Sequence, residues 1–296
     1  MKIYDCFMFS DEKMLLNLRL KSLEKFVDKF VIVEASYFHN GQSKKLNFDI
    51  NEFAEFKHKI EYIVVKDQPQ DILTADNKEE VLQSDQKKII NSILRDNYQR
   101  DKLTEALQNL DRDDLIIVSD LDEIPKLSSV NFNKIDNEIL IFKQKMFYYK
   151  FNLIYENFNW FGTKAVKRKN FKSAQWLRNI KSKKYPFWRL DSIFSKKKYQ
   201  NINFIKDGGW HFTSIKDPEK IHFKLSNFMH HLEFEESGLS VTDMKKMVSE
   251  KKILYDHRAD KKNKKYDGSQ KLVKATDDVL PKYILDNKKK YLRWFD

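Results

Sequence analysis

Two aspartates separated by a single residue form the pattern in this chain best suited to chemistry. Asp120 and Asp122 lie in Ser119-Asp120-Leu121-Asp122-Glu123-Ile124-Pro125, directly after the apolar run that begins at Asp114. Alternate residues that leave an extended strand point the same way, so the two carboxylates can converge. Close carboxylates repel one another unless a cation lies between them, so this spacing indicates Mg²⁺ or Mn²⁺ shared with substrate phosphates.

The same segment also has a purely structural interpretation. An acidic turn can cap a following helix, and Pro125 suits the first position of such a helix. Its place at the end of an apolar run favours metal and diphosphate binding, because ligands of open α/β sheets bind outside the carboxyl ends of the strands.

The segments around this turn predict an α/β fold with a mostly parallel central sheet and helices on its faces. The apolar runs have the length and composition of buried strands, and the longer segments between them repeat apolar residues every three or four positions. We expect strands over 3–9, 29–35, 60–65 and 114–119, and helices after Ser10-Asp11-Glu12 and over 78–110. Residues just after the strands are the ones to inspect, namely 9–12, 34–36 and 120–125.

The second half of the chain differs in pattern. Residues 138–171 are rich in aromatics and alternate as antiparallel strands do, and 187–194 also resemble a strand. Asp217-Pro218-Glu219 predicts a helix that runs to about Phe234. The last ~50 residues are rich in lysine and helical in pattern. We therefore expect a catalytic domain over 1–240 and a basic helical extension over 241–296 packed on it.

Composition and charge limit the class of protein. The 296 residues carry a net charge of +12 and a single cysteine, Cys6, which excludes a disulfide framework or a cysteine-based metal site. No apolar run approaches the ~18 residues of a membrane span. We expect a cytoplasmic protein whose contact with anionic membrane, at the inner face, is at most peripheral. The lysine excess indicates phosphate-rich partners or simply a solvated surface in a lysine-biased chain.

Several segments, in order along the chain, resemble glycosyltransferase family 17, which contains the enzyme that adds bisecting N-acetylglucosamine to N-glycans. They are Ile3-Tyr4-Asp5-Cys6-Phe7-Met8-Phe9 followed by Glu12, Leu15 and Arg19, then Phe30-Val31-Ile32-Val33-Glu34-Ala35, Gln99-Arg100, residues 119–125, Gly208-Gly209-Trp210-His211-Phe212 and His231-Leu232-Glu233-Phe234. This resemblance implies a GT-A-like fold, a UDP-sugar donor such as UDP-N-acetylglucosamine, a divalent metal and transfer with inversion to a glycan or lipid-linked glycan acceptor.

Candidate residues follow from these patterns and from the resemblance. The predicted metal ligands are Asp120, Asp122 and His211; the predicted donor contacts are Phe9, Glu12, Glu34, Arg100 and Asp120; the general-base candidates, unranked, are Glu123, Asp191 and Glu233; the acceptor-cleft rings are Tyr148, Trp160 and Trp188. His211 can equally be a core residue, Arg100 a surface ion pair, and the aromatic rings part of the core.

Two other classes of protein fit some of these features. A metal-dependent nucleotidyltransferase or nuclease also uses carboxylates at strand ends and a basic surface, although the clustered aromatics are unlike a stacking groove for nucleic acid. A glycan-binding protein without catalytic activity would use the acidic turn only structurally. We expect no specific nucleic-acid partner, and the sequence leaves the oligomeric state open.

Overall fold

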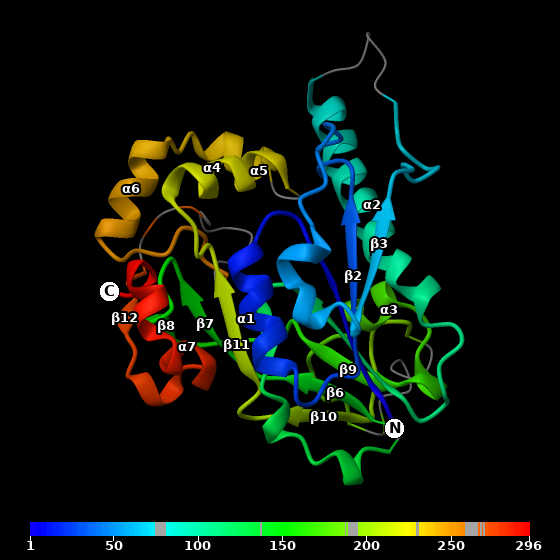
Figure 1. Ribbon diagram of the computed structural model, residues 1–296. Coiled ribbons are helices and arrows are strands. Elements are labelled where there is room, and N and C mark those ends of the chain that lie inside the picture. Colours follow the sequence, from blue (N-terminus) through cyan, green and yellow to red (C-terminus); the bar gives the residue numbers. More distant parts are fainter. Residues whose placement is uncertain are drawn as a thin grey trace.

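Apolar segments near the N-terminus pair in parallel and begin a seven-stranded sheet. A computed structural model describes residues 1–74, 81–136, 138–186, 188, 195–228, 231–257, 266, 268 and 270–296. Among these residues the strand order is β10-β6-β9-β4-β1-β2-β3. Figure 1 shows β2 beside β3, and β9, β6 and β10 in succession. The strands are β1 (Ile3–Met8), β2 (Lys29–Ala35), β3 (Ile60–Val65), β4 (Leu115–Asp120), β6 (Ile139–Phe142), β9 (Lys164–Lys167) and β10 (Ile202–Ile205).

The direction of the strands fixes where a ligand can bind. β1 pairs in parallel with β2 and β4, and β2 pairs in parallel with β3, so the carboxyl ends of these four strands share one edge. β9 is antiparallel to both β4 and β6. The predicted mostly parallel sheet is therefore confirmed, with β9 inserted against the parallel direction.

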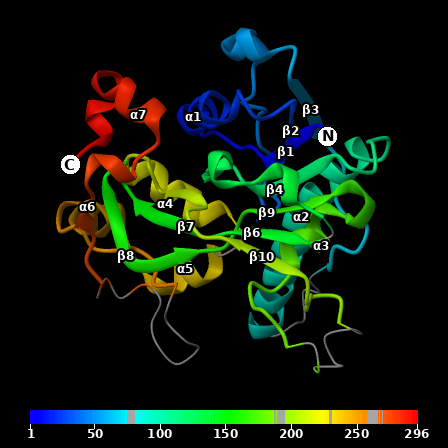
Figure 2. The same ribbon diagram turned by 90° about the horizontal axis from the view of Figure 1, so that it is seen from below.

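Helices cover both faces of this sheet, as the alternation of side chains requires. Leu115 and Ile117 of β4 pack with the leucines of α1 (Lys13–Leu23). Ile116 and Val118 face the other way, toward α2 (Val81–Ala106) and α3 (Ala174–Asn179). Figure 2 shows α1 on one side of the sheet and α2 and α3 on the other.

The aromatic segment predicted as antiparallel strands builds most of a second sheet, in the order β12-β8-β7-β11-β5. Its strands are β5 (Glu123–Pro125), β7 (Gln144–Tyr148), β8 (Leu153–Trp160), β11 (Gly209–Thr213) and β12 (Val273–Lys274). Buried rings of β7 and β8 pack with α4 (Pro218–Asn227), α5 (His231–Ser237) and α6 (Val241–Ser249). Gly209 has φ of 112°, and a Cβ there would lie 2.2 Å from the carbonyl oxygen of Ile124, so only glycine fits where β11 passes β5.

The C-terminal part contains strand as well as helix. β12 pairs with β8, and residues of α7 (Lys282–Asp286) and the turn after it lie in the same core as α1. The helix predicted from Asp217 to about Phe234 is two helices, α4 and α5, and the predicted strand over 187–194 lies outside the described residues except for Trp188. No helix in the described part of the chain combines the length and apolar character needed to span a bilayer.

Candidate active site

The Asp120–Glu123 turn lies at the carboxyl edge of the central sheet, where β4 ends and β5 begins. Arg19 of α1 has no exposed side-chain surface and holds this turn in place. The two hydrogens of its Nη1 are shared among three carbonyl oxygens of the turn, those of Asp120 (3.0 Å), Leu121 (3.2 Å) and Glu123 (2.8 Å). A planar guanidinium has enough donors to satisfy several carbonyls at once, so the turn is fixed in shape before any ligand binds.

Asp120 is held by two arginines. Its Oδ1 accepts a hydrogen bond from Arg100 Nη2 at 3.2 Å, and its Oδ2 accepts one from Arg178 Nη2 at 2.7 Å. Burial alone would raise the pKa of Asp120, but the charges of Arg178 and Arg100 outweigh burial and hold that pKa well below its usual range. Asp120 is therefore ionised at neutral pH, and 36% of its side chain remains exposed.

Glu123 lies beneath Asp120 and has no exposed side-chain surface. Its carboxylate accepts hydrogen bonds from both Nη atoms of Arg178 at 2.8 Å, from Trp160 Nε1 at 2.5 Å and from the backbone N–H of Asp120 at 2.9 Å. A Cβ at Gly162 would lie 1.9 Å from Glu123 Oε1, so glycine there makes room for the carboxylate. Glu123 therefore anchors the turn, and its carboxylate has no exposed surface at which another molecule could bind.

Asp122 points to a different set of partners. Its Oδ1 lies 3.5 Å from His211 Nε2, and its Oδ2 lies 4.0 Å from Lys224 Nζ. Burial would raise the pKa of Asp122, but His211 and Lys224 lower it overall. The His211 ring lies 4.8 Å from the Trp160 ring, and its Nδ1 has no hydrogen-bond partner among the described residues.

Two lysines complete the charged surface beside Asp122. Lys224 Nζ and Lys216 Nζ lie 3.1 Å and 3.2 Å from Glu12 Oε1, at the N-terminus of α1. Burial would lower the pKa of Lys224, yet Glu12 and Asp122 raise it well above its ordinary value. Lys224 therefore keeps its positive charge at neutral pH, between the carboxylates of Glu12 and Asp122.

The metal centre expected from the sequence is only partly assembled. Among the described residues, no three His, Cys, Asp or Glu side chains come together as ligands, so Asp120, Asp122 and His211 do not form one cluster. The physical reason is that both oxygens of Asp120 are bonded to arginines. Asp122 and His211 fit a divalent ion held by two side chains and completed by substrate oxygens, since carboxylate and imidazole both suit Mn²⁺.

The predicted donor contacts lie at different depths. Arg100, with 6% of its side chain exposed, and Glu12 lie among the charged residues around the turn, and Arg100 is held by Asp96 at 2.7 Å. Phe9 is buried in the core against Phe48. Glu34 is also buried, and its oxygens are occupied by the chain itself. Its donors are the backbone N–H groups of Asn47 (2.8 Å) and Phe48 (3.1 Å), the hydroxyl of Tyr62 (2.9 Å) and the ammonium of Lys44.

The remaining candidates have different surroundings. Tyr148 is buried and donates its hydroxyl to the carbonyl of Tyr255, whereas Trp188 is 67% exposed. Glu233 lies half-buried in α5, and Asp191 lies outside the described residues. Trp160 is the one ring of the predicted acceptor group shown here in contact with the site, through His211 and Glu123.

The sequence patterns did not predict Arg178 and Lys224, which supply much of the positive charge beside Asp120 and Asp122. Both lie far along the chain from Asp120 and outside any local motif. One signal was present for Arg178: only nine of the 56 basic residues are arginine, so an arginine retained in a lysine-rich chain indicates a need for its planar fork.

Comparison with known proteins supplies the context for this geometry. The family model of glycosyltransferase family 17 matches residues 1–182, more than half of the 296-residue chain. The matched part contains Arg19, Arg100, Asp120, Asp122 and Arg178. No curated protein matches the chain.

Proposed function

Because the chain belongs to glycosyltransferase family 17, we propose that it is an inverting, metal-dependent enzyme that transfers N-acetylglucosamine from UDP-N-acetylglucosamine to a glycan or lipid-linked glycan. Family membership makes the protein a glycosyltransferase with a GT-A-like α/β fold. The donor sugar, the metal ion and the stereochemical course are proposed.

One observation supports this proposal more than any other. Carboxylates and cations alternate at the carboxyl edge of the parallel strands, with Arg178 2.7 Å from Asp120 and Lys224 4.0 Å from Asp122. A nucleotide diphosphate brings negative charge, which Lys224 and Lys216 can bind. It also brings sugar hydroxyls, which can donate hydrogen bonds to the exposed part of the Asp120 carboxylate.

In the proposed reaction an acceptor hydroxyl oxygen forms a bond to the anomeric carbon while the bond from that carbon to the diphosphate oxygen breaks. The bonding electron pair leaves with UDP, so negative charge grows on the diphosphate. Lys224, fixed between Glu12 and Asp122, is positioned to stabilise that charge. A divalent ion bound by Asp122 and His211 would supply Lewis-acid stabilisation of the same leaving group.

The proton of the acceptor hydroxyl needs a base. Glu123 is enclosed by Arg178 and Trp160, which leaves Asp191 and Glu233 from the original candidates. If Glu233 is the base, Glu233→Gln lowers kcat and removes the acidic limb of the kcat/KM pH profile, because that limb reports protonation of the free base. An unchanged limb would exclude Glu233 and leave Asp191 as the candidate to test.

A donor screen tests the proposed function without knowledge of the acceptor. Slow release of UDP is measured for a set of UDP-sugars, with Mn²⁺ and with a chelator, because transferases of this type hydrolyse their donor at a low rate. We expect release from UDP-N-acetylglucosamine that requires the metal. Equal release with the chelator would contradict the proposed metal dependence. Release from another nucleotide sugar instead would contradict the proposed donor.

A further inference from the structure

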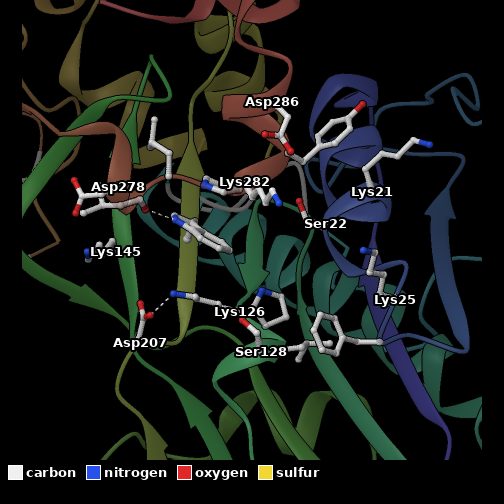
Figure 3. Close-up of a pocket in the computed structure, with 18 of the residues that line it drawn as sticks. Lys21, Ser22, Lys25, Lys126, Ser128, Lys145, Asp207, Asp278, Lys282 and Asp286 are labelled. Atoms are coloured by element: carbon white, nitrogen blue, oxygen red, sulfur yellow. Dashed lines mark hydrogen bonds and ion pairs between the residues drawn. The ribbon is translucent and has the colours of Figure 1, made fainter.

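A second concave region, separate from the aspartate turn, is lined by lysines. It has a volume of about 940 Å³ and lies between the end of α1, the turn after β5 and residues 278–286 near the C-terminus (Figure 3). Its lysines come from segments far apart in the sequence: Lys21, Lys25, Lys126, Lys145, Lys206 and Lys282. We call this region the lysine groove.

Most of these lysines form no ion pair with the residues that the structure describes. Lys21 pairs with Glu55, and Lys126 pairs with Asp207. Within the described ranges, the other four, namely Lys25, Lys145, Lys206 and Lys282, form no ion pair or side-chain hydrogen bond. Figure 3 shows Lys145 and Lys25 on opposite sides of the groove and Lys282 between them. Like charges gathered in a concave surface raise the local potential, so the groove attracts anions more strongly than scattered surface lysines do.

The lysine groove is distinct from the proposed donor site. Glu12, which pairs with Lys216 and Lys224, stands at the N-terminus of α1, whereas Lys25 follows its C-terminus. The 11 residues of α1 separate the two by about 16 Å along the helix axis. The unpaired lysines therefore do not serve the diphosphate that Lys224 is positioned to bind.

Other groups in the groove define the class of anion. Trp210 is fixed by a hydrogen bond from its Nε1 to the carbonyl of Val279 at 2.6 Å, and Phe26 and Tyr283 add two more partly buried rings. Aromatic faces cover the C–H faces of sugar rings, and the groove also holds aspartates, Asp278 and Asp286, that accept hydrogen bonds from hydroxyls. We propose that the lysine groove binds an acidic oligosaccharide, whose carboxylates or phosphates pair with the free lysines.

This chemistry fits an acidic oligosaccharide better than other polyanions. Nucleic acid carries a phosphate about every 3.4 Å along each strand, and the groove's aspartates would repel such dense charge. A membrane surface does not enter a concave region between two walls of protein. An acidic sugar chain offers hydroxyls between its charges, matching aspartates between lysines. The inference does not depend on the proposed function.

Calorimetric binding of a short oligogalacturonate, without donor or metal, tests the inference. The variant Lys25→Glu with Lys282→Glu reverses two exposed charges of the groove. The control Lys57→Glu with Lys66→Glu makes the same change in net charge at exposed lysines beyond the groove lining. We expect the groove variant to lose affinity by roughly tenfold or more, and the control to bind as the wild type does.

Further measurements separate the alternatives. A neutral malto-oligosaccharide of equal length should bind more weakly than the acidic one, and the acidic one should lose affinity as salt is added. Equal loss in the two double variants, with both melting like wild type, would overturn the inference. So would tighter binding of a thymidine oligonucleotide or of anionic vesicles. Because the titration contains no donor, a negative result would not contradict the proposed transferase reaction. A negative donor screen likewise would not contradict binding of an acidic oligosaccharide in the lysine groove.

Discussion

Arg19 and Asp5 form a fully buried, two-point ion pair, with Nη2 2.6 Å from Oδ1 and Nε 2.8 Å from Oδ2. Asp5 lies on β1 and Arg19 on α1, and the same guanidinium binds the carbonyls of the Asp120–Glu123 turn. A charge removed from water needs a charged partner and satisfied donors. The first strand, the first helix and the turn that carries the site are therefore joined at one side chain.

Arg19→Lys should destabilise the protein although it keeps the charge. A single ammonium cannot reach Asp5 and the turn carbonyls together, so we expect the free energy of unfolding to fall by about 3 kcal/mol. Chemical denaturation measures this change. The control, Arg112→Lys at an exposed position, should stay within about 0.5 kcal/mol of wild type. If Arg19→Lys changed the free energy of unfolding as little as the control does, the guanidinium would not be what joins the strand, the helix and the turn.

Arg178→Ala should also be costly, because it leaves the buried Glu123 carboxylate without its cation. We expect a loss of about 3 kcal/mol in the free energy of unfolding. Arg293→Ala is the matched control, since it breaks an ion pair with Asp217 in which the arginine is largely exposed, and should cost under about 1 kcal/mol. Equal losses in the two variants would mean that Arg178 adds no more than a surface pair does.

These contacts show which residues of the site a single sequence can predict. Asp120 and Asp122 were found because their signal is local: an apolar strand and two carboxylates at its end. Glu34 carries the same local signal, yet the loop over residues 44–48 folds back and occupies its oxygens. Arg178 reaches Asp120 only through the packing of α3 beside β4 and β9, and a single sequence does not contain that apposition.

The fold could be predicted more fully than the site, because most of its strands also leave a local pattern in the sequence. β2 and β3 have the bounds that their apolar runs predict, and a strand buried on both faces, as β2 is, demands such a run. The helix predicted over 217–234 is interrupted after Asn227, and nothing in its apolar spacing indicates that break. Pairings between distant segments, such as β12 with β8, leave no local pattern at all.

Lys164 should make stability depend on pH near neutrality. It lies beneath the site, donates to the carbonyls of Arg178 and Ile180, and burial, reinforced by Arg178, lowers its pKa to about 7. Above pH 7 the folded state releases this proton while the unfolded chain keeps it up to about pH 10. The unfolded state then binds more protons, so this residue makes the free energy of unfolding rise with pH, by up to about 1.4 kcal/mol per unit.

The comparison of wild type with Lys164→Met isolates this contribution. Denaturation at several values between about pH 6 and 8, one unit either side of the Lys164 pKa of about 7, gives the slope for each protein. Subtraction cancels the other titrating groups, including the Cys6 thiol, whose pKa burial raises. We expect a difference in slope that is positive for the wild type. Parallel lines would show that Lys164 keeps an ordinary pKa.

His211→Ala should weaken the binding of metal more than the fold. If Nε2 is a ligand beside Asp122 Oδ1, its loss should reduce the affinity for Mn²⁺ in the presence of UDP by about 10- to 100-fold. Isothermal titration measures that affinity, and thermal melting shows whether the variant folds. The control His58→Ala changes an exposed histidine in the turn before β3. A variant that melts far below wild type would instead assign His211 to the core, where it packs on Trp160.

Asp122→Asn is the sharpest test of the proposed chemistry. Asparagine keeps the size of the side chain but removes the charge that faces His211 and Lys224, so the variant should fold and lose turnover of UDP-sugar by about 10³-fold, or about 4 kcal/mol in the barrier. Asp71→Asn, at an exposed position, serves as the control and should react at the wild-type rate. Added Mn²⁺ should restore little activity, because an amide is a poorer ligand than a carboxylate. Near-normal turnover in a folded Asp122→Asn protein would mean that leaving-group charge is stabilised by Lys224 and its neighbours alone.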